Sequence, residues 1–380
     1  MGERRDVAVV LSGGGMNGVL LEVGFLQRLR ESTLWPRIGC VYGTSAGALS
    51  GTMAALDRID ELETFLLGLQ PEDTFRPQRL WRLPLNGLHA YELPRTIAER
   101  VGDPAALARS LADSPIELVV FATDVTDDDT GDGSYELAYS SWTTPPETMG
   151  AAVLASAAIS ALVLPRPVGD RIATDGGWVR NFPLGRAYER EETELIVAFR
   201  YVPRYPRVGV AQLVRLRERL SRFRAVPPVR AFIAELQEAE ERSGRNEPAH
   251  LGDMLLRLMR VTIQSNTALE ERLANEREAS RRELEALRVD VLELALEHAR
   301  PTRRSRVGRE LEARFAATRL PRSITRVTVH GSAGMESLDP GFRSQRPWTD
   351  AAKRALIERG WQLCDAELRA YGIDAFEQAS

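Results

Sequence analysis

The first 56 residues alternate twice between a short apolar run and a helix-like stretch, and this order constrains the fold more than any other feature. The run "DVAVVLS" (6–12) ends in glycines, and residues 18–30 then show apolar side chains at helical spacing. A second apolar run, "RIGCVYG" (37–43), precedes a helix of small residues at 45–56. A strand-helix-strand-helix start favours a parallel sheet with helices on its faces. The chain is therefore predicted to have an α/β fold.

The same patterns continue as far as residue 200. We predict three further strands, at 116–123, 134–140 and 194–200, and an alanine-rich helix at 146–158. The segment "YVPRYPRVG" (201–209) contains two prolines and marks a change of composition. We therefore expect a core at 6–205 and a mainly helical C-terminal region at 206–372 that packs on the core.

In the C-terminal region, segments dense in Arg and Glu predict helices at 210–224, 228–242 and 250–287. The first half of helix 250–287 is expected to bury a leucine stripe, and its second half to be a solvated arm rather than a coiled coil. "RVDVLELAL" (288–296) and "SITRVTVHG" (323–331) are candidate returning strands, and a helix at 349–371 is expected to close the fold.

Charge and cysteine content exclude several classes of protein. The net charge of −4 and the pI near 5.8 give no global basic field for nucleic acid. Cys40 and Cys364 are too few for a disulfide framework, and their spacing fits no zinc site. The N-terminal apolar run is too short for a signal peptide, and no stretch approaches 18 apolar residues. We expect a cytoplasmic protein without a transmembrane segment, and peripheral contact with a membrane is left open.

Ser45 stands in "GTSAG" (43–47), a Gly-x-Ser-x-Gly motif between a predicted strand and a predicted helix. A sharp turn at this point exposes the serine hydroxyl, and glycines on both sides leave room for that turn. A serine needs a base and oxyanion donors to act as a nucleophile. The context favours a catalytic serine over a chance match.

The glycine-rich "SGGGMNG" (12–18) lies between the first strand and the first helix. Such a turn directs several backbone N–H groups to one point, and the helix N-terminus adds positive potential. A dinucleotide-binding loop is the rival interpretation, but the glycine spacing matches it loosely. Because the second strand brings Ser45 beside this loop, an oxyanion hole is the better role.

The general base is less obvious from sequence. The four histidines, His89, His250, His298 and His330, have no clear catalytic neighbourhood. Asp175, in "IATDGGWVRNFPL" (172–184), ends an apolar run and is followed by two glycines, so it should lie at a tight turn at the sheet edge. A carboxylate held there against a serine could act as base without histidine. A plain Asp-Gly turn is the alternative.

Together these motifs resemble the patatin-like phospholipases, lipid acyl hydrolases with a Ser–Asp dyad. "GGGMNG", "GTSAG" and "DGG" look like the family's glycine loop, nucleophile elbow and aspartate motif, and they occur in the right order. "ASAAISALVLPRPV" (155–168) and "VRNFPL" (179–184) are similar to the segments around the aspartate. The resemblance covers residues 6–200, with a weaker echo at 349–371.

The resemblance implies a three-layer α/β/α fold with a central, mostly parallel sheet, and no metal or organic cofactor. It implies Ser45 as nucleophile and Asp175 as base. The implied oxyanion loop, with amides near Gly14 and Gly15 as donors, is Gly13, Gly14, Gly15, Met16, Asn17 and Gly18. The implied supporting glycines are Gly43, Gly47, Gly176 and Gly177.

Two positions depart from the family pattern. Asn17 replaces the usual Arg or Lys, so a neutral amide stands where the family has a charge, and Ser160 stands where proline is common. A charge-assisted hydrogen bond is roughly twice as strong as a neutral one. The change at Asn17 predicts lower activity or weaker preference for phosphate.

Two other segments invite functional interpretations. "TDVTDDDTGDG" (123–133) is rich in aspartate but does not fit an EF-hand, so a solvated loop is favoured over a calcium site. "RLWRLPLNGLHAYELP" (79–94) is irregular and partly apolar; a membrane-touching lid and ordinary packing over the helix after Ser45 are equal alternatives.

The sequence thus predicts hydrolysis of a lipid ester at a membrane or micelle surface by Ser45 and Asp175 through an acyl-enzyme. Three alternatives stay open: a Ser-Asp-His esterase using one of the later histidines, an acyltransferase, and a catalytically weak module that binds lipid.

Overall fold

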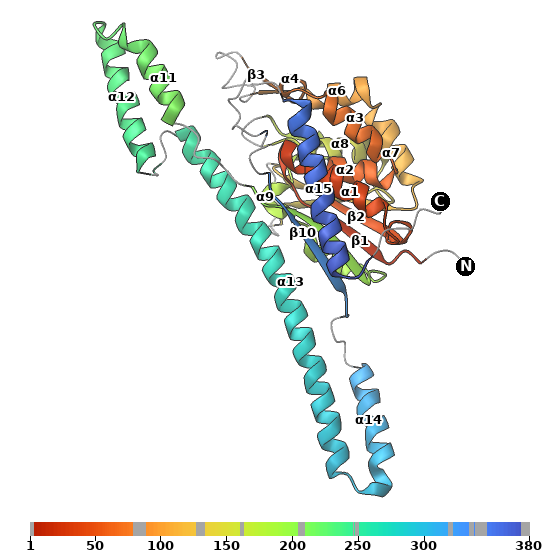
Figure 1. Ribbon diagram of the computed structural model, residues 1–380. Coiled ribbons are helices and arrows are strands. Elements are labelled where there is room, and N and C mark those ends of the chain that lie inside the picture. The colour runs from red at the N-terminus through yellow and green to blue at the C-terminus, as the bar shows by residue number, and fades with distance from the viewer. Residues whose placement is uncertain are drawn as a thin grey trace.

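The computed structural model describes residues 4–78, 89–126, 134–159, 163–203, 210–245, 247, 251–317, 322–333, 338 and 348–373. Its centre is an eight-stranded sheet in the order β10-β9-β1-β2-β5-β8-β7, with β6 also paired to β5 (Figure 1). The strands are β1 (Val7–Leu11), β2 (Ile38–Thr44), β5 (Glu117–Asp124), β6 (Glu136–Ser140), β7 (Arg166–Val168), β8 (Arg171–Asp175), β9 (Leu195–Tyr201) and β10 (Thr325–Gly331). A separate antiparallel pair joins β3 (Phe75–Pro77) to β4 (His89–Tyr91).

The sheet is parallel from β10 to β5 and antiparallel beyond β5, where β6, β8 and β7 pair. The predicted central, mostly parallel sheet is confirmed, and so are the predicted strands at 6–12, 37–43, 116–123, 134–140, 194–200 and 323–331, within a few residues.

Alternating side chains of the central strands build two apolar layers. In β1, Val7, Val9 and Leu11 join the larger core cluster, which contains α1 and α15, whereas Ala8 and Val10 join the cluster on the opposite face. Every residue of β1 is buried because helices cover both faces of this parallel part of the sheet. The three-layer α/β/α architecture is thus confirmed.

Shorter helices lie on both faces of the sheet. They are α1 (Gly15–Arg30), α2 (Ala46–Ala55), α3 (Ile59–Gly68), α4 (Pro71–Thr74), α6 (Leu93–Arg100), α7 (Pro104–Ala112), α8 (Pro146–Ser156), α9 (Gly177–Arg180), α10 (Leu184–Glu189) and α15 (Asp350–Ala370). Short 3₁₀ turns occur at Trp35–Arg37 and Pro301–Arg303.

Helices α1 and α15 cross at two glycines. A Cβ on Gly24 would lie 1.8 Å from the carbonyl oxygen of Ile357, and one on Gly360 would lie 2.0 Å from that of Leu21. Only glycine permits this approach, which brings the end of the chain back onto the first helix. The predicted closing helix at 349–371 is confirmed.

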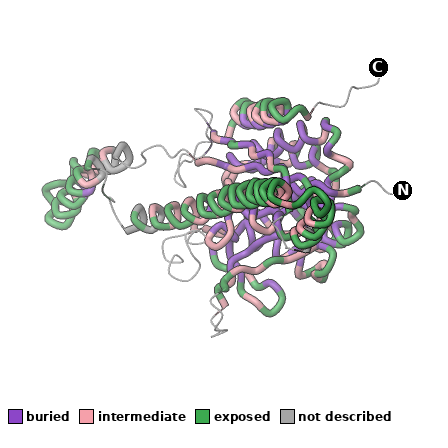
Figure 2. Tube along the Cα trace, turned by 90° about the horizontal axis from the view of Figure 1, so that it is seen from below, coloured by how far each residue is buried: buried purple, intermediate pink, exposed green. Residues whose placement is uncertain are grey.

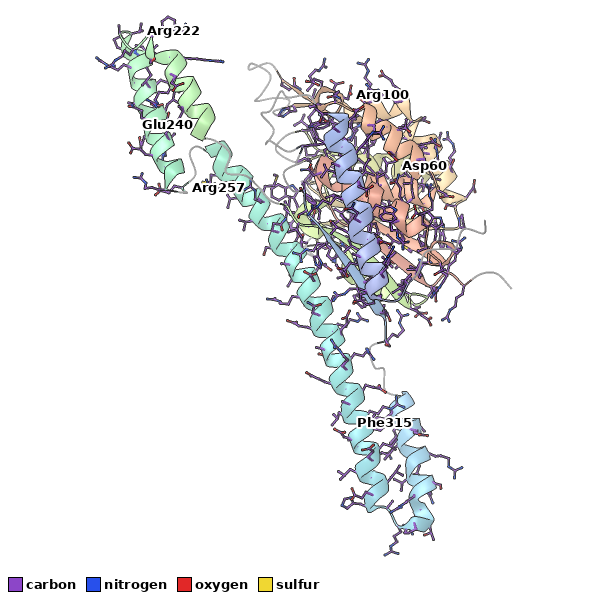
Figure 3. All side chains as sticks on the ribbon, in the orientation of Figure 1. Asp60, Arg100, Arg222, Glu240, Arg257 and Phe315 are labelled. Atoms are coloured by element: carbon purple, nitrogen blue, oxygen red, sulfur yellow. The ribbon has the colours of Figure 1, made fainter. Side chains whose placement is uncertain are left out.

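The C-terminal helices extend beyond this body (Figure 1). Helices α11 (Val210–Ser221) and α12 (Pro227–Gly244) form a hairpin, α13 (Leu251–His298) has 48 residues, and α14 (Arg304–Ala317) folds back along its end. At 1.5 Å per residue α13 is about 72 Å long. Glu240 of α12 pairs with Arg217 of α11 at 2.8 Å, and Phe315 of α14 lies under the Arg288 guanidinium of α13 (Figure 3).

One sequence prediction is wrong here: residues 288–296 belong to α13 and not to a strand. Their alternating valines and leucines continue an uninterrupted helix, which neither proline nor glycine stops before His298.

A second correction concerns the buried face of α13. In its first half, expected to bury a leucine stripe, Leu258 is 51% exposed, and the side chains of Leu251 and Leu255 lie outside those that the structure describes. In its second half, expected to be a solvated arm, Leu269 and Leu273 are 43% and 51% exposed. The face that meets the core carries Thr267 and Ala274, both buried. Figure 2 shows the outer side of this helix as exposed over much of its length.

Three predicted features lie wholly or partly outside the described residues. They are most of the aspartate-rich loop (127–133), most of the irregular apolar segment (79–88) and Ser160. Among the helices that the structure describes, none combines the length and the apolarity needed to cross a bilayer.

Candidate active site

Ser45 is the first residue after β2 and the N-cap of α2. Its backbone has φ 56° and ψ −117°, a left-handed conformation that a serine adopts only at a steric cost. The turn is tight: a Cβ on Gly47 would lie 2.5 Å from the carbonyl oxygen of Leu11 in β1. The neighbouring strand and helix therefore hold Ser45 in a strained position, as the motif predicted.

Strand β5 brings Asp175 to this turn. Its residue Phe121 pairs with Thr44, the last residue of β2, and the next residue, Ala122, pairs with Asp175 of β8. The opposite edge of β5 is occupied by β6, where Ala122 pairs with Leu137. Strand β8 therefore lies on the same edge of β5 as β2 and follows directly after it. Ser45 and Asp175 are 130 positions apart in sequence, yet they meet where these two strands end on β5.

The two side chains are directly hydrogen-bonded. The Ser45 hydroxyl donates to Asp175 Oδ2 at 2.7 Å, and the Gly177 amide donates to Asp175 Oδ1 at 2.7 Å. The Asp175 backbone is also fixed, because its amide donates to the Ala158 carbonyl and its carbonyl accepts from the Thr123 hydroxyl. Both oxygens of the carboxylate thus have partners, and one of these is the candidate nucleophile.

Burial dominates the electrostatics of Asp175, which is 6% exposed. Loss of solvent raises the pKa of its carboxyl to about 6, although the hydrogen bonds from Ser45 and Gly177 lower it in part. A carboxyl with this pKa is mostly ionised at neutral pH and still basic enough to accept a proton.

The glycine loop lies against Ser45. A Cβ on Gly13 would approach Ser45 Cβ to 3.2 Å, and Gly15 has φ +57°. The amide of Gly13 donates to the Asn181 carbonyl and that of Gly18 to the Gly14 carbonyl, so these two of the predicted loop amides already have acceptors. Helix α1 begins at Gly15, and the first amides of an α-helix have no acceptor within the helix.

Asn17 is fully buried on α1, and its Oδ1 accepts from the Leu338 amide at 2.8 Å. The residue that replaces the family's cation thus ties the start of α1 to a distant part of the chain. Met16, its neighbour, lines the cavity described below.

Ser156 is a supporting residue that sequence reasoning missed. Its hydroxyl accepts from the Ser45 amide at 2.9 Å and donates to the Phe121 carbonyl at 2.6 Å, so it links the elbow to β5. The available signal was a serine within the alanine-rich stretch 151–158.

The turn after Asp175 connects several parts of the site. The Thr44 hydroxyl donates to the Arg180 carbonyl at 2.8 Å, and the Gly13 amide donates to the Asn181 carbonyl at 2.9 Å. Asn266 and Thr267 of α13 contact the same turn from the outside. No role of α13 at this turn was predicted, because the sequence pattern of the helix distinguishes its leucines but not its individual polar residues.

An apolar cavity opens beside Ser45. Its lining comes mainly from α1, α2, α3, α6, α7 and α8, and no charged residue is among the described residues that form it. Representative lining side chains are Met16, Leu49, Met53, Phe65, Ile97 and Val153. A chain of methylene groups fits this environment better than any polar ligand.

The histidines do not join the site in the described part of the chain. His298 Nδ1 lies 2.9 Å from the Leu294 carbonyl, His330 Nε2 lies 2.9 Å from Glu271, and His89 is in the small β3–β4 pair. His250 lies outside the described residues. Within those residues, no group of three or more His, Cys, Asp or Glu side chains could hold a metal ion.

Comparison with known proteins gives a family for the part of the chain that holds both Ser45 and Asp175. Residues 9–188 match the family model described as Patatin-like phospholipase. Among solved structures, the crystal structure of VipD from Legionella pneumophila matches with 14% identity and a TM-score of 0.38, over 96% of this chain and 67% of that one. No curated protein sequence matches the chain.

Proposed function

Because residues 9–188 belong to the patatin-like phospholipase family, a family of lipid acyl hydrolases, we propose that the protein hydrolyses fatty-acyl esters with Ser45 as nucleophile and Asp175 as general base. The observation that carries the proposal is the 2.7 Å hydrogen bond from the strained Ser45 to the buried Asp175. A nucleophile in contact with a base of suitable pKa is the minimum that acyl transfer to serine requires.

In the first step the Ser45 oxygen attacks the acyl carbonyl carbon while the hydroxyl proton passes to Asp175. The tetrahedral intermediate collapses, the C–O bond to the alcohol breaks, and Asp175 returns the proton to the leaving oxygen. Water then attacks the acyl-enzyme, giving its proton to Asp175, and the fatty acid leaves as Ser45 regains a proton. Neither step needs a metal or an organic cofactor.

The oxyanion of each intermediate is assigned to the start of α1. The amide of Gly14 and the first-turn amides of Gly15 and Met16 are the proposed donors, since those of Gly13 and Gly18 have acceptors. The positive end of the helix dipole supports negative charge at the same place.

The apolar cavity beside Ser45 is assigned to the fatty-acyl chain. Each buried methylene contributes about 0.8 kcal/mol, so the chain, and not the headgroup, would supply most of the binding energy. We propose that the protein meets its lipid substrate at a membrane or micelle surface in the cytoplasm. The free and buried Cys40 and Cys364 are compatible with a reducing compartment.

The test is fatty-acid release from phospholipids, lysophospholipids and glycerides by the full chain and by Ser45→Ala and Asp175→Asn. Ser110→Ala and Asp113→Asn are matched controls, because both residues are exposed. We expect both dyad variants to lose at least about a thousandfold in kcat, within the range for removal of a triad member, and both controls to keep the wild-type rate.

Other outcomes would identify the alternatives. Loss of most of the activity when His250, His298 and His330 are all replaced by alanine would indicate a Ser-Asp-His triad, because a Ser–Asp dyad keeps its activity in that variant. Acylated alcohol among the products would indicate an acyltransferase. Tight lipid binding without release of fatty acid would contradict the hydrolytic proposal and support a binding module.

A further inference from the structure

Asp175 is followed by a turn that cannot satisfy its own backbone. Helix α9 has only 4 residues, Gly177–Arg180, and the Gly177 amide is already committed to Asp175 Oδ1. The last four carbonyls of a helix have no intrahelical N–H donor, so nearly every carbonyl of α9 needs a donor from outside the helix. Whatever supplies these partners also fixes the amide that holds the Asp175 carboxylate.

Asn266 of α13 supplies the donors for two of these carbonyls with one side chain. Its Nδ2 donates to the Gly177 carbonyl at 2.8 Å and to the Trp178 carbonyl at 3.0 Å, and its Oδ1 accepts from the Asn181 amide at 3.3 Å. One amide group thus bridges the beginning and the end of α9. No other residue type of this size both donates twice and accepts in this way.

Thr267, the next residue, holds the far end of the turn. Its hydroxyl accepts from Asn181 Nδ2 at 2.9 Å and donates to the Ile263 carbonyl of its own helix at 2.7 Å. Thr267 is fully buried, so water cannot replace this bond without a rearrangement. Asn181 is thereby fixed, and its carbonyl accepts from the Gly13 amide of the glycine loop.

We propose that Asn266, supported by Thr267, is a positioning residue for Asp175 and that α13 is therefore part of the catalytic apparatus. This inference rests on the proposed hydrolytic function. Asn266 touches neither the substrate nor the reacting atoms. It acts through the Gly177 amide on one side and through Asn181 and the glycine loop on the other.

The chain offers matched controls on the same helix. Asn275, nine positions after Asn266, is exposed, and its Oδ1 accepts a hydrogen bond from Arg326. Thr262 is exposed, and its hydroxyl donates to the Leu258 carbonyl, just as the Thr267 hydroxyl donates to a carbonyl of the same helix. Among the described residues, Thr262 has no contact with the turn after Asp175. Asn275→Ala and Thr262→Val therefore test the loss of the same groups away from the turn.

We expect Asn266→Ala to lower kcat roughly 10- to 100-fold with KM within about twofold, because small misplacements of catalytic groups cost this much. Thr267→Val should lower kcat several-fold, and both controls should keep the wild-type kcat. Equal losses in kcat for Asn266→Ala and Asn275→Ala, or an unchanged kcat in Asn266→Ala, would overturn the inference.

Asn266→Asp adds a readout that a merely structural role would not change. The new carboxylate would lie beside the turn whose Gly177 amide donates to Asp175. Its negative charge should raise the pKa of Asp175 and move the acid limb of the pH–rate profile to higher pH. Asn275→Asp adds the same charge elsewhere on α13 and should leave the profile unchanged. Identical profiles for the two aspartate variants would contradict the proposed contact.

A measurement that needs no turnover separates this inference from the proposed function. The Asp175 carboxyl can be titrated by NMR in protein labelled with ¹³Cγ-aspartate, with Asp175→Asn identifying its signal. A wild-type protein that releases no fatty acid would sink the proposed function alone. A pKa of Asp175 that is the same in wild type, Asn266→Asp and Asn275→Asp would sink the positioning role alone.

Discussion

The central sheet and helix α13 are built on opposite principles. Strands β1, β2 and β9 are buried apolar strands, and their side chains pack between helices on both faces. Helix α13 contacts the same body with Asn, Thr and Glu side chains and exposes Leu258, Leu269 and Leu273. The sheet therefore supplies stability through burial, whereas α13 supplies directed hydrogen bonds to one turn.

The difference also appears in the charged contacts. Along α13, Glu270 pairs with Arg180 and accepts from the Gly185 amide at 2.9 Å, while Glu271 pairs with Arg200. These bonds have fixed partners and directions, which apolar contacts lack. A surface of this kind sets a geometry and adds little of the hydrophobic driving force for folding.

The largest difference in the free energy of unfolding should come from a leucine-to-alanine substitution made once in each of the two regions. Leu20 on α1 is fully buried and Leu273 on α13 is 51% exposed. Leu20→Ala should cost about 2–5 kcal/mol in the free energy of unfolding because it leaves a cavity, and Leu273→Ala should cost less than about 0.5 kcal/mol. Chemical denaturation measures both; similar losses would mean that the outer face of α13 is covered in solution.

The pH dependence sharpens the catalytic side of the comparison. Since the pKa of Asp175 is raised to about 6 and the base must be ionised, kcat/KM should fall about tenfold per pH unit below 6. An acid whose pKa is higher in the folded state loses stability as pH rises from its unfolded pKa to its folded pKa.

Asp175→Asn should therefore raise the melting temperature relative to wild type at pH values above 6 and should not raise it near pH 4. Scanning calorimetry at several pH values checks this. A pH-independent difference would mean that burial does not control the titration of Asp175.

A smaller loss of stability is expected from substitution of a residue that supports the turn at Ser45. Ser156→Ala removes the acceptor of the Ser45 amide and the donor to the Phe121 carbonyl, both buried. The expected loss of stability is about 1–3 kcal/mol, with a lower kcat. Ser110→Ala, on the exposed side of α7, is the control. Equal effects of the two substitutions would show that Ser156 does not support the elbow.

The sequence predicted the sheet and brought Ser45 and Asp175 into one hypothesis, because buried strands and strained glycine turns leave local patterns. It did not predict Asn266 or Thr267, because a polar side chain facing a backbone turn has the same sequence appearance as one facing water. The expected burial of Leu258 in the first half of α13 failed for a related reason: periodicity reveals a face but not which side of the helix meets the core. Residues 288–296 failed as a strand since helical continuity overrode their β-branched composition.

The smallest predicted effect is the difference in stability between variants at two glutamates, which lie five positions apart on α13. Glu271 is 20% exposed and contacts Arg200 and His330 of the sheet, whereas Glu276 is 63% exposed and pairs only at 3.6 Å with Arg272 of its own helix among its described contacts. Glu271→Gln should cost about 1–2 kcal/mol because a partly buried guanidinium loses its partner. Glu276→Gln should change stability by less than about 0.5 kcal/mol, and added salt should abolish even that difference. If the two losses are equal, the ordered contact between α13 and the sheet does not persist in solution, and the positioning of Asp175 through α13 loses its support.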